Sequence, residues 1–329
     1  MSHAKSNLFP PPRSDDGTAA IPPRKAAGTA AILALIVANA ALAFGPWFVR
    51  MADTGPVSSA FWRIALAAPV LGIAALASGA RGRAMRPQRM GGALWGLLAL
   101  AGICFAGDLG AWHIGILKTT LANATLFGNS AIFMFPIYGF VVARVWPSRG
   151  QAMALLLALA GAMLLMGRSY DLDPRNLMGD LFCLLAGLLY TAYFVLMARA
   201  REQLAPLHAL AMSTAFSVVP LLLFALAMGE RILPSAWTPL IGLALCSQVL
   251  GQGLMVYVLG KFTPLVIGIA LLLQPVMAGI IGVFAYDEWL GPADLAGAVM
   301  VGVALVMVTR ASAVASRDAR PTLATGDER

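Results

Sequence analysis

Two ionisable side chains stand inside long apolar runs of this sequence, where a charge needs either a function or a partner. Arg63 lies in the run 57–79 and Asp108 in the run 91–112. A charge at the centre of a membrane costs about 2.5–3.5 kcal/mol on insertion scales. Counting along each helix places both residues about 6–8 Å below the same surface. We expect them to form an ion pair that either gates a pathway or only fixes the packing of two helices.

His113 follows Asp108 by five residues and is expected near the same interface. Histidine changes its charge near physiological pH, which suits a proton relay. The alternative is a histidine that is simply hydrated at the membrane surface. Proton coupling through Asp108 and His113 is therefore a hypothesis for this chain.

Uncharged polar side chains form a third group, at about half the depth of the apolar runs. Transporters bind their solutes near this level, although such groups also join helices as contacts worth about 0.6–2 kcal/mol. Tyr138, Tyr190 and Tyr193 also lie away from the run ends and suit an aromatic or amphipathic solute. We expect a central polar chamber, with these candidates for solute contact: Asn39, Asn129, Tyr190, Gln248, Gln252 and Gln274.

An intramembrane enzyme is the alternative function from another class. Gly128-Asn129-Ser130 superficially resembles a Gly-x-Ser nucleophile turn, but a serine nucleophile needs a base within hydrogen-bond reach. His113 is expected near the outer end and His208 at the inner end of other runs, far from Ser130. No metal-ligand cluster appears in the runs, so we expect no enzyme, cofactor or metal. The three cysteines read as apolar packing residues.

The amino-acid composition indicates whether the protein lies in water or in lipid. Hydrophobic residues make up 60% of the 329 residues and charged residues only 12%, about half the charged fraction of a soluble domain. The net charge of +8 comes from basic residues in loops and tails rather than on one helical face. These features predict a membrane protein with lipid as a partner, and argue against binding of nucleic acid.

Membrane-spanning helices must position the polar side chains, because a span needs about 20 apolar residues. With both termini inside, 17 of the 23 Lys and Arg residues fall inside, 5 outside, and Arg63 within a span. Lys and Arg gather on the cytoplasmic side, so we expect cytoplasmic termini. Ten runs qualify as spans: 27–49, 57–79, 91–112, 119–143, 150–167, 176–198, 208–229, 236–257, 263–285 and 290–309.

Internal prolines indicate a duplication of five helices. Pro69 and Pro220 lie in the second and seventh runs, and Pro136 and Pro275 in the fourth and ninth. Since five is odd, the second copy would enter the membrane from the opposite side, as in many transporters. The fold class expected is an all-α polytopic membrane protein with two inverted five-helix repeats. The expected units are a disordered cytoplasmic tail 1–26, repeats 27–167 and 176–309, and a second tail 310–329.

Three short segments carry a family resemblance. They are Phe61-Trp62-Arg63-Ile64-Ala65-Leu66-Ala67, then Gly179-Asp180-Leu181 with Leu189-Tyr190-Thr191-Ala192-Tyr193, and last Tyr286-Asp287-Glu288-Trp289-Leu290 with Gly297 and Gly302. In their order and spacing the chain resembles the drug/metabolite transporter superfamily, in particular its EamA-like family, over roughly residues 27–309. The resemblance implies a ten-helix exporter or exchanger of metabolites.

Together these observations predict a transporter of the inner membrane, which moves a small metabolite, amino acid or drug-like solute by alternating access in the outward direction. An intramembrane enzyme or a non-transporting membrane protein is the alternative. Neither the solute nor self-association follows from the sequence. Gly161, Gly167, Gly297 and Gly302 fit close helix packing without a dimer.

Overall fold

The computed structural model describes residues 28–81, 91–119, 127–166, 174–286 and 291–318. Within these ranges the chain consists of helices joined by turns and short loops, without any strand. The predicted all-α fold class is confirmed. Glu288 and the N-terminal tail 1–26 lie outside the described residues.

Counting only described residues, the first half of the chain contains five helical segments, the first of which is interrupted at Phe44. Its helices are α1 (Thr29–Ala43), α2 (Gly45–Met51), α3 (Pro56–Arg81), α4 (Gly92–Ile116), α6 (Ala131–Ala143) and α7 (Arg149–Met166). Pro69 lies inside α3 and Pro136 inside α6. Proline is tolerated there because neighbouring helices satisfy the freed backbone groups.

The second half also forms five segments, preceded by the short 3₁₀-helix η1 (Pro174–Asn176), and two of them are interrupted. One contains a π-helix, η2, whose wider turns are rare in proteins and frequent at functional sites. The helices are α8 (Leu177–Gln203), α9 (Pro206–Ala227), α10 (Thr238–Gly242), η2 (Leu243–Gln252), α11 (Gly253–Leu259), α12 (Pro264–Leu271), α13 (Leu273–Tyr286) and α14 (Pro292–Asp318).

In the part of the chain that the structure describes, eight segments are long and apolar enough to cross a membrane, whereas α6 and α7 are shorter apolar helices. At 1.5 Å per residue, α6 is about 20 Å long, which is less than the roughly 30 Å of the hydrocarbon core. Two predicted boundaries change. The run 119–143 is a continuous helix only over 131–143 within the described residues, and α14 continues beyond residue 309 to Asp318.

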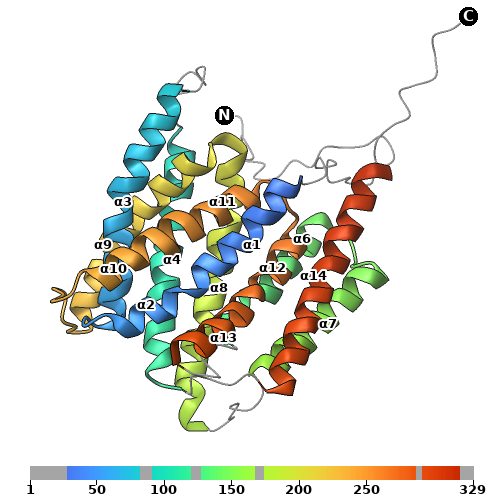
Figure 1. The fold of residues 1–329 in the computed structure, drawn as a ribbon. Helices are drawn as coiled ribbons and strands as arrows, with labels where there is room; N and C mark the ends of the chain where they lie inside the picture. The colour runs from blue at the N-terminus through green and yellow to red at the C-terminus, as the bar shows by residue number, and fades with distance from the viewer. Residues whose placement is uncertain (1–27, 82–90, 120–126, 167–173, 287–290, 319–329) are drawn as a thin grey trace, which may run out of the picture.

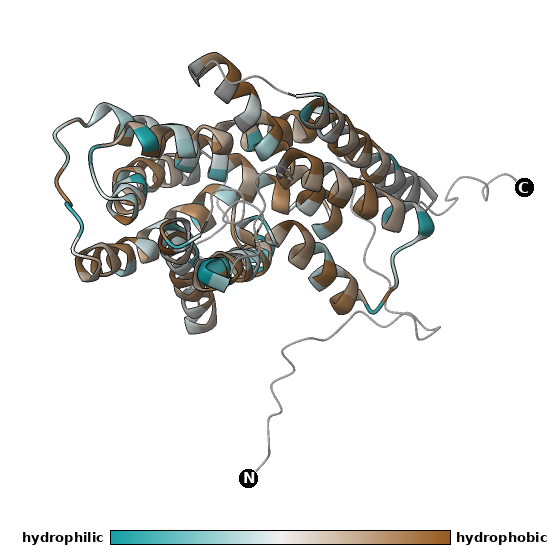
Figure 2. Ribbon diagram, turned by 90° about the horizontal axis from the view of Figure 1, so that it is seen from below, coloured by the Kyte–Doolittle hydropathy of each residue, from teal (hydrophilic) through white to brown (hydrophobic). Residues whose placement is uncertain are grey.

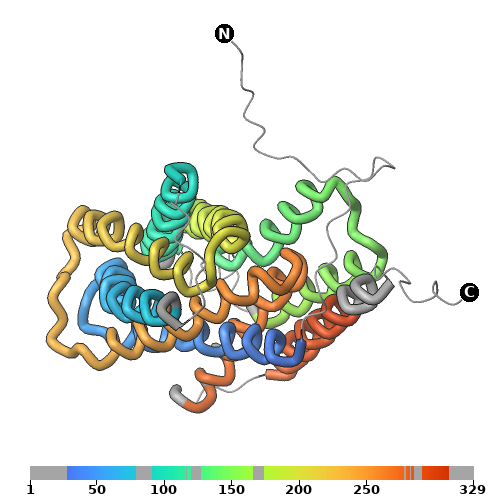
Figure 3. The backbone as a smooth tube through the Cα atoms, turned by 90° about the horizontal axis from the view of Figure 1, so that it is seen from above, coloured from blue at the N-terminus to red at the C-terminus, as the bar shows by residue number. Residues whose placement is uncertain are grey.

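The helices pack in pairs that join the two halves of the chain. Figures 1 and 3 show α7 beside α14 at one edge and α3 beside α9 at the other. Between these edges α6 packs on α12, α4 on α8 and α9, and α1 on η2. Figure 1 also shows that α14 ends on the side of the molecule where α1 begins.

Close helix contacts depend on glycine at particular positions. A Cβ atom on Gly161 of α7 would lie 2.9 Å from the carbonyl oxygen of Gly297 on α14, and a Cβ on Gly297 would lie 2.7 Å from that of Gly161. A Cβ on Gly302 would meet nothing within 4 Å. The predicted close packing therefore holds for Gly161 and Gly297 and not for Gly302.

The outward faces of the helices are apolar. Large hydrophobic side chains such as Ile73, Leu76, Leu223, Phe284 and Val299 are more than 60% exposed. In Figure 2 hydrophobic brown predominates along the helices, whereas the connecting loop at the left is largely hydrophilic teal. This surface suits lipid, and the protein is a multi-pass membrane protein.

Candidate functional site

Arg63 lies about two turns after the start of α3, and its guanidinium group points toward the second half of the chain. Its Nε atom donates a hydrogen bond to Oε1 of Gln248 on η2, at 3.1 Å. Its Cζ atom lies 5.7 Å from the centre of the Phe105 ring on α4, within cation–π range. The residue predicted from its cost in an apolar run therefore joins three helices.

Gln248 continues this contact to α9. Its amide Nε2 donates a hydrogen bond of 3.1 Å to Oγ1 of Thr214, and both side chains are fully buried. A buried amide needs such partners, because an unpaired polar group in an apolar interior loses about 1–3 kcal/mol. One chain of hydrogen bonds thus links Arg63 of the first half to η2 and α9 of the second.

Gln252 lies on the same side of the helix as Gln248, and Tyr190 of α8 approaches it. The Tyr190 hydroxyl donates to Oε1 of Gln252 over 3.5 Å, a long hydrogen bond. The Nε2 atom of Gln252 and the hydroxyl of Tyr193 are buried without a hydrogen-bond partner. We call Arg63, Tyr190, Tyr193, Thr214, Gln248 and Gln252 the central polar cluster.

Aromatic rings form one wall of this cluster. The rings of Phe105 and Tyr193 stack with centroids 4.6 Å apart. Tyr190 stacks on Tyr193 at 6.1 Å and packs against Phe194 at 4.3 Å. Since these rings come from α4 and α8, the packing of those two helices places an apolar wall beside the guanidinium of Arg63.

Arg63 and Asp108, both among the described residues, do not form the predicted ion pair. No guanidinium nitrogen of Arg63 lies within 4 Å of a carboxylate oxygen of Asp108. The two charges attract each other electrostatically over a longer distance. The reason is geometric. Phe105, one turn before Asp108 on α4, faces the guanidinium, and Nε of Arg63 donates its hydrogen bond to Gln248.

His113 is buried in α4, with only 4% of its surface exposed, so the structure does not support the hydrated alternative. Its Nδ1 atom makes a hydrogen bond with the carbonyl oxygen of Leu109, and its ring meets that of Trp112 edge-on. Its Nε2 atom is buried without a partner. His113 lies one to two turns from Asp108 on the same helix.

Asn39 and Gln274 form a separate pair. Nε2 of Gln274 donates 3.2 Å to Oδ1 of Asn39, and Nδ2 of Asn39 donates 2.8 Å to the carbonyl oxygen of Leu35 in its own helix. Gln274 is the second residue of α13, directly after the interruption at Leu272. These two candidates contact each other, and no hydrogen bond given by the structure joins them to the central polar cluster.

Asn129 lies in a turn that follows the helical residues Phe127 and Gly128 and precedes α6, so the helix is interrupted at this candidate. The turn packs against α8, where a Cβ atom on Gly187 would lie 2.0 Å from Oγ of Ser130. The Ser130 hydroxyl contacts Sδ of Met134 at 3.9 Å, and no base contacts it in the described part of the chain. This environment does not favour a serine nucleophile.

A second polar contact, which sequence analysis missed, joins two loops at the end of the molecule opposite the start of α1. The carboxylate of Glu230 accepts hydrogen bonds from the backbone N–H groups of Val57 at 3.2 Å and Ser58 at 2.7 Å. These groups belong to the first turn of α3, where backbone N–H groups lack partners within the helix. Glu230 therefore caps α3 from a loop in the other half of the chain.

Three further contacts hold the same two loops together. Asp53 accepts hydrogen bonds from the backbone N–H of Ser235 at 2.7 Å and lies 3.8 Å from Arg231. Trp62 donates through Nε1 to the carbonyl oxygen of Ile232 at 2.7 Å. The hydrogen bond from Ser235 lowers the pKa of Asp53 below its ordinary value. We call the contacts of loops 52–58 and 228–237, with Trp62, the interloop clasp.

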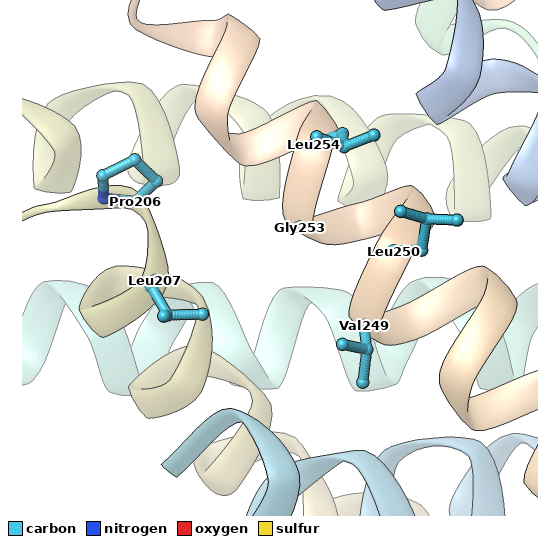
Figure 4. A pocket seen from close by; sticks show the side chains of 6 residues that line it. All are labelled: Pro206, Leu207, Val249, Leu250, Gly253 and Leu254. Carbon is cyan, nitrogen blue, oxygen red and sulfur yellow. The ribbon is translucent and has the colours of Figure 1, made fainter. Parts of the chain in front are cut away.

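One groove on the described surface lies away from these polar groups (Figure 4). It has a volume of about 260 Å³ between the first turn of α9 and the junction of η2 with α11. Its lining is apolar, so it offers no hydrogen bond to a polar solute and suits lipid. It is lined by Pro206, Leu207, Val249, Leu250, Gly253 and Leu254.

Some of the residues that sequence analysis missed could have been found from their pattern. Thr214 lies among Ser213 and Ser217, three buried hydroxyl residues in an otherwise apolar run, which was a usable signal. Phe105 and Glu230 had none, because one is an ordinary apolar residue and the other lies in a loop. Among the described residues the cluster offers hydrogen-bond donors beside an aromatic wall, an arrangement whose chemistry suits binding of a polar group.

Comparisons with known proteins agree with this fold. Residues 177–310 match the EamA-like transporter family, which confirms the predicted resemblance over that range, and the segment Phe61–Ala67 lies outside it. A crystal structure shares the fold with a TM-score of 0.70 at 15% identity, covering 86% of this chain and 96% of the other. No curated protein matches the chain.

Proposed function

We propose, from the premise that residues 177–310 form an EamA-like transporter unit of a multi-pass membrane protein, that the chain is a carrier of a small solute. The observation that carries this proposal is the hydrogen-bonded chain from Arg63 through Gln248 to Thr214. It joins α3 of the first half to η2 and α9 of the second. A solute bound among these groups would contact both halves, as alternating access requires.

The packing of the helices supports two inverted repeats. If the five segments of each half correspond in order, α3 packs on its counterpart α9, α6 on α12 and α7 on α14. The remaining contacts also correspond, since α4 packs on α8 as η2 packs on α1. A two-fold relation between the halves produces this pattern, and it allows two equivalent states open to opposite sides of the membrane.

The charge distribution supports cytoplasmic termini in the inner membrane, with the interloop clasp at the outer surface. The clasp would then close the outer side in the state described here and open for release of an exported solute. Asp108 and His113 are the groups proposed for proton coupling. If they act so, a pH gradient will stop driving transport in Asp108→Asn and His113→Ala, whereas unchanged coupling in both removes them from that role.

Counterflow in proteoliposomes tests the proposal. Vesicles loaded with a labelled extract of metabolites should exchange the transported component against the same unlabelled compound outside. A channel would dissipate the label without exchange, and an enzyme would change it chemically. Vesicles with the Gln252→Leu variant should exchange it at least tenfold more slowly. If the wild-type protein exchanges no component of the extract, whether the labelled extract is inside or outside the vesicles, the proposal of a carrier is rejected.

A further inference from the structure

Hydrogen-bond donors in the central polar cluster outnumber their acceptors. A guanidinium group has five N–H donors and no acceptor, and toward the described residues Arg63 uses only Nε, in its bond to Gln248. Nε2 of Gln252 and the hydroxyl of Tyr193 are fully buried, and neither has a hydrogen-bond partner within 3.5 Å among the described residues. Such groups are costly unless a ligand or water satisfies them.

The charge at this position calls for an anionic partner. Arg63 is a cation in the interior of a membrane protein, and the nearest opposite charge, on Asp108, does not come within 4 Å of it. The two terminal nitrogens of a guanidinium match the two oxygens of a carboxylate. An amine would instead meet a like charge. The free donors therefore select a solute that carries acceptor oxygens and a negative charge.

The surroundings of the guanidinium restrict the rest of the solute. Phe105 lies 5.7 Å from Cζ of Arg63 and stacks at 4.6 Å on Tyr193. Tyr190 and Phe194 extend this wall. A flat or aliphatic ring on the solute would pack against these rings while its carboxylate remains within reach of Arg63.

We propose that the central polar cluster binds a compact monocarboxylic acid with an apolar ring or chain, its carboxylate held by Arg63, Gln252 and Tyr193. This inference rests on the proposed carrier function and names its class of substrate. Arg63 supplies the charge, the Gln252 amide and the Tyr193 hydroxyl supply further donors, and the aromatic wall receives the apolar body.

Binding to the full-length protein in detergent tests the proposal without transport. The probes are 3-phenylpropanoate, cyclohexanepropanoate and hexanoate, each compared with its amide and its amine. At least one acid should bind about 10- to 100-fold more tightly than its amide, the range expected for a charge-assisted hydrogen bond. The amine should bind more weakly still. An amide or amine that binds as tightly as its acid, or no response to any acid, overturns the proposal.

Substitutions test whether the central polar cluster causes the preference for an acid over its amide. Arg63→Gln should reduce the ratio of acid to amide affinity to about one, and Tyr193→Phe, which keeps the ring, should weaken acid binding several-fold. Arg149→Gln, at the exposed start of α7, is the matched control and should keep the ratio. If Arg63→Gln loses its folded elution profile, Tyr193→Phe decides, and an unchanged acid affinity in that variant overturns the proposal. Acid binding without counterflow of any solute would instead reject the carrier function alone.

Discussion

The carboxylate of Glu230 lies 2.7 Å from the backbone nitrogen of Ser58, a residue 172 positions away in the other half of the chain. A negative charge at the start of a helix interacts favourably with the exposed N–H groups and with the helix dipole. Because α3 also carries Arg63, this contact fixes the first turn of the helix that brings the guanidinium to η2. The interloop clasp and the central polar cluster are therefore connected through one rigid element.

The Glu230→Gln variant tests the clasp. Replacing the carboxylate by an amide removes a charge-assisted acceptor, so the free energy of unfolding should fall by about 1–3 kcal/mol. Thermal unfolding in detergent measures it, and cysteine labelling at position 54 in a cysteine-free background should show greater access. Glu202→Gln, at the exposed end of α8, is the control and should leave both unchanged. Equal stability of the two variants would contradict a stabilising role.

Gly55 gives a second test of the same contact without a change of charge. A Cβ atom at this position would lie 2.3 Å from the Glu230 carboxylate, so the loop has to shift to accommodate it. Gly55→Ala should therefore lower the unfolding temperature, and in combination with Glu230→Gln the two losses should not add, because both remove one contact. Full additivity would show that Gly55 acts elsewhere.

The hydrogen bonds of Asp53 predict that its contact with the loop containing Ser235 weakens in acid. Its pKa is lowered chiefly by the hydrogen bond from the backbone N–H of Ser235. A carboxyl group with a lowered pKa stabilises the folded state above its unfolded pKa, near 4, and this contribution is lost as the pH falls through the lower folded pKa. Hydrogen exchange at Ser235 and Ala236 should therefore accelerate in acid beyond the intrinsic trend. In Asp53→Asn this pH dependence should disappear, and its persistence would assign it to another group.

Sequence analysis singled out residues whose energetic cost in an apolar run can be read from the sequence alone. A charged or amide side chain in an apolar run has to be satisfied, so Arg63, Gln248 and Gln252 were recognisable without coordinates. Their partners were not, because the rotation of each helix about its axis decides which neighbour a side chain meets. Asp108 has a suitable charge and predicted depth for Arg63, yet Phe105 faces the guanidinium and Gln248 accepts the hydrogen bond from it.

The long-range contacts of loops were also beyond sequence reasoning. Glu230 and Asp53 lie outside the apolar runs, where a charge needs no explanation. The turn at Asn129 was equally hidden, since hydropathy predicts one continuous helix over 119–143 and the structure interrupts it before α6. Hydropathy reports the mean polarity of a segment and does not reveal where a helix begins within it.

The pair Gln248 and Thr214 predicts a functional effect in the membrane centre. Gln248→Leu removes the acceptor for Arg63 and the donor for Thr214 together, which leaves a partly buried guanidinium with one hydrogen bond fewer. Hydrogen bonds to charged groups contribute about 1.5–3 kcal/mol, so counterflow should slow by about tenfold or more. Ser78→Ala is the control, because Ser78 bonds only to its own helix. Equal rates in the two variants would remove Gln248 from the pathway.

The contact between α7 and α14 predicts that alanine has opposite effects on stability at Gly161 of α7 and at Gly302 of α14. A Cβ on Gly161 would lie 2.9 Å from the Gly297 carbonyl oxygen, so Gly161→Ala must separate two backbones and should cost about 1–3 kcal/mol. Gly302→Ala meets open space and replaces a poor helix former, so its stability should stay equal or rise by up to about 1 kcal/mol. Unfolding of both variants in the same detergent compares them. Should Gly161→Ala prove as stable as Gly302→Ala, α7 and α14 cannot lie as close as the glycine contact requires.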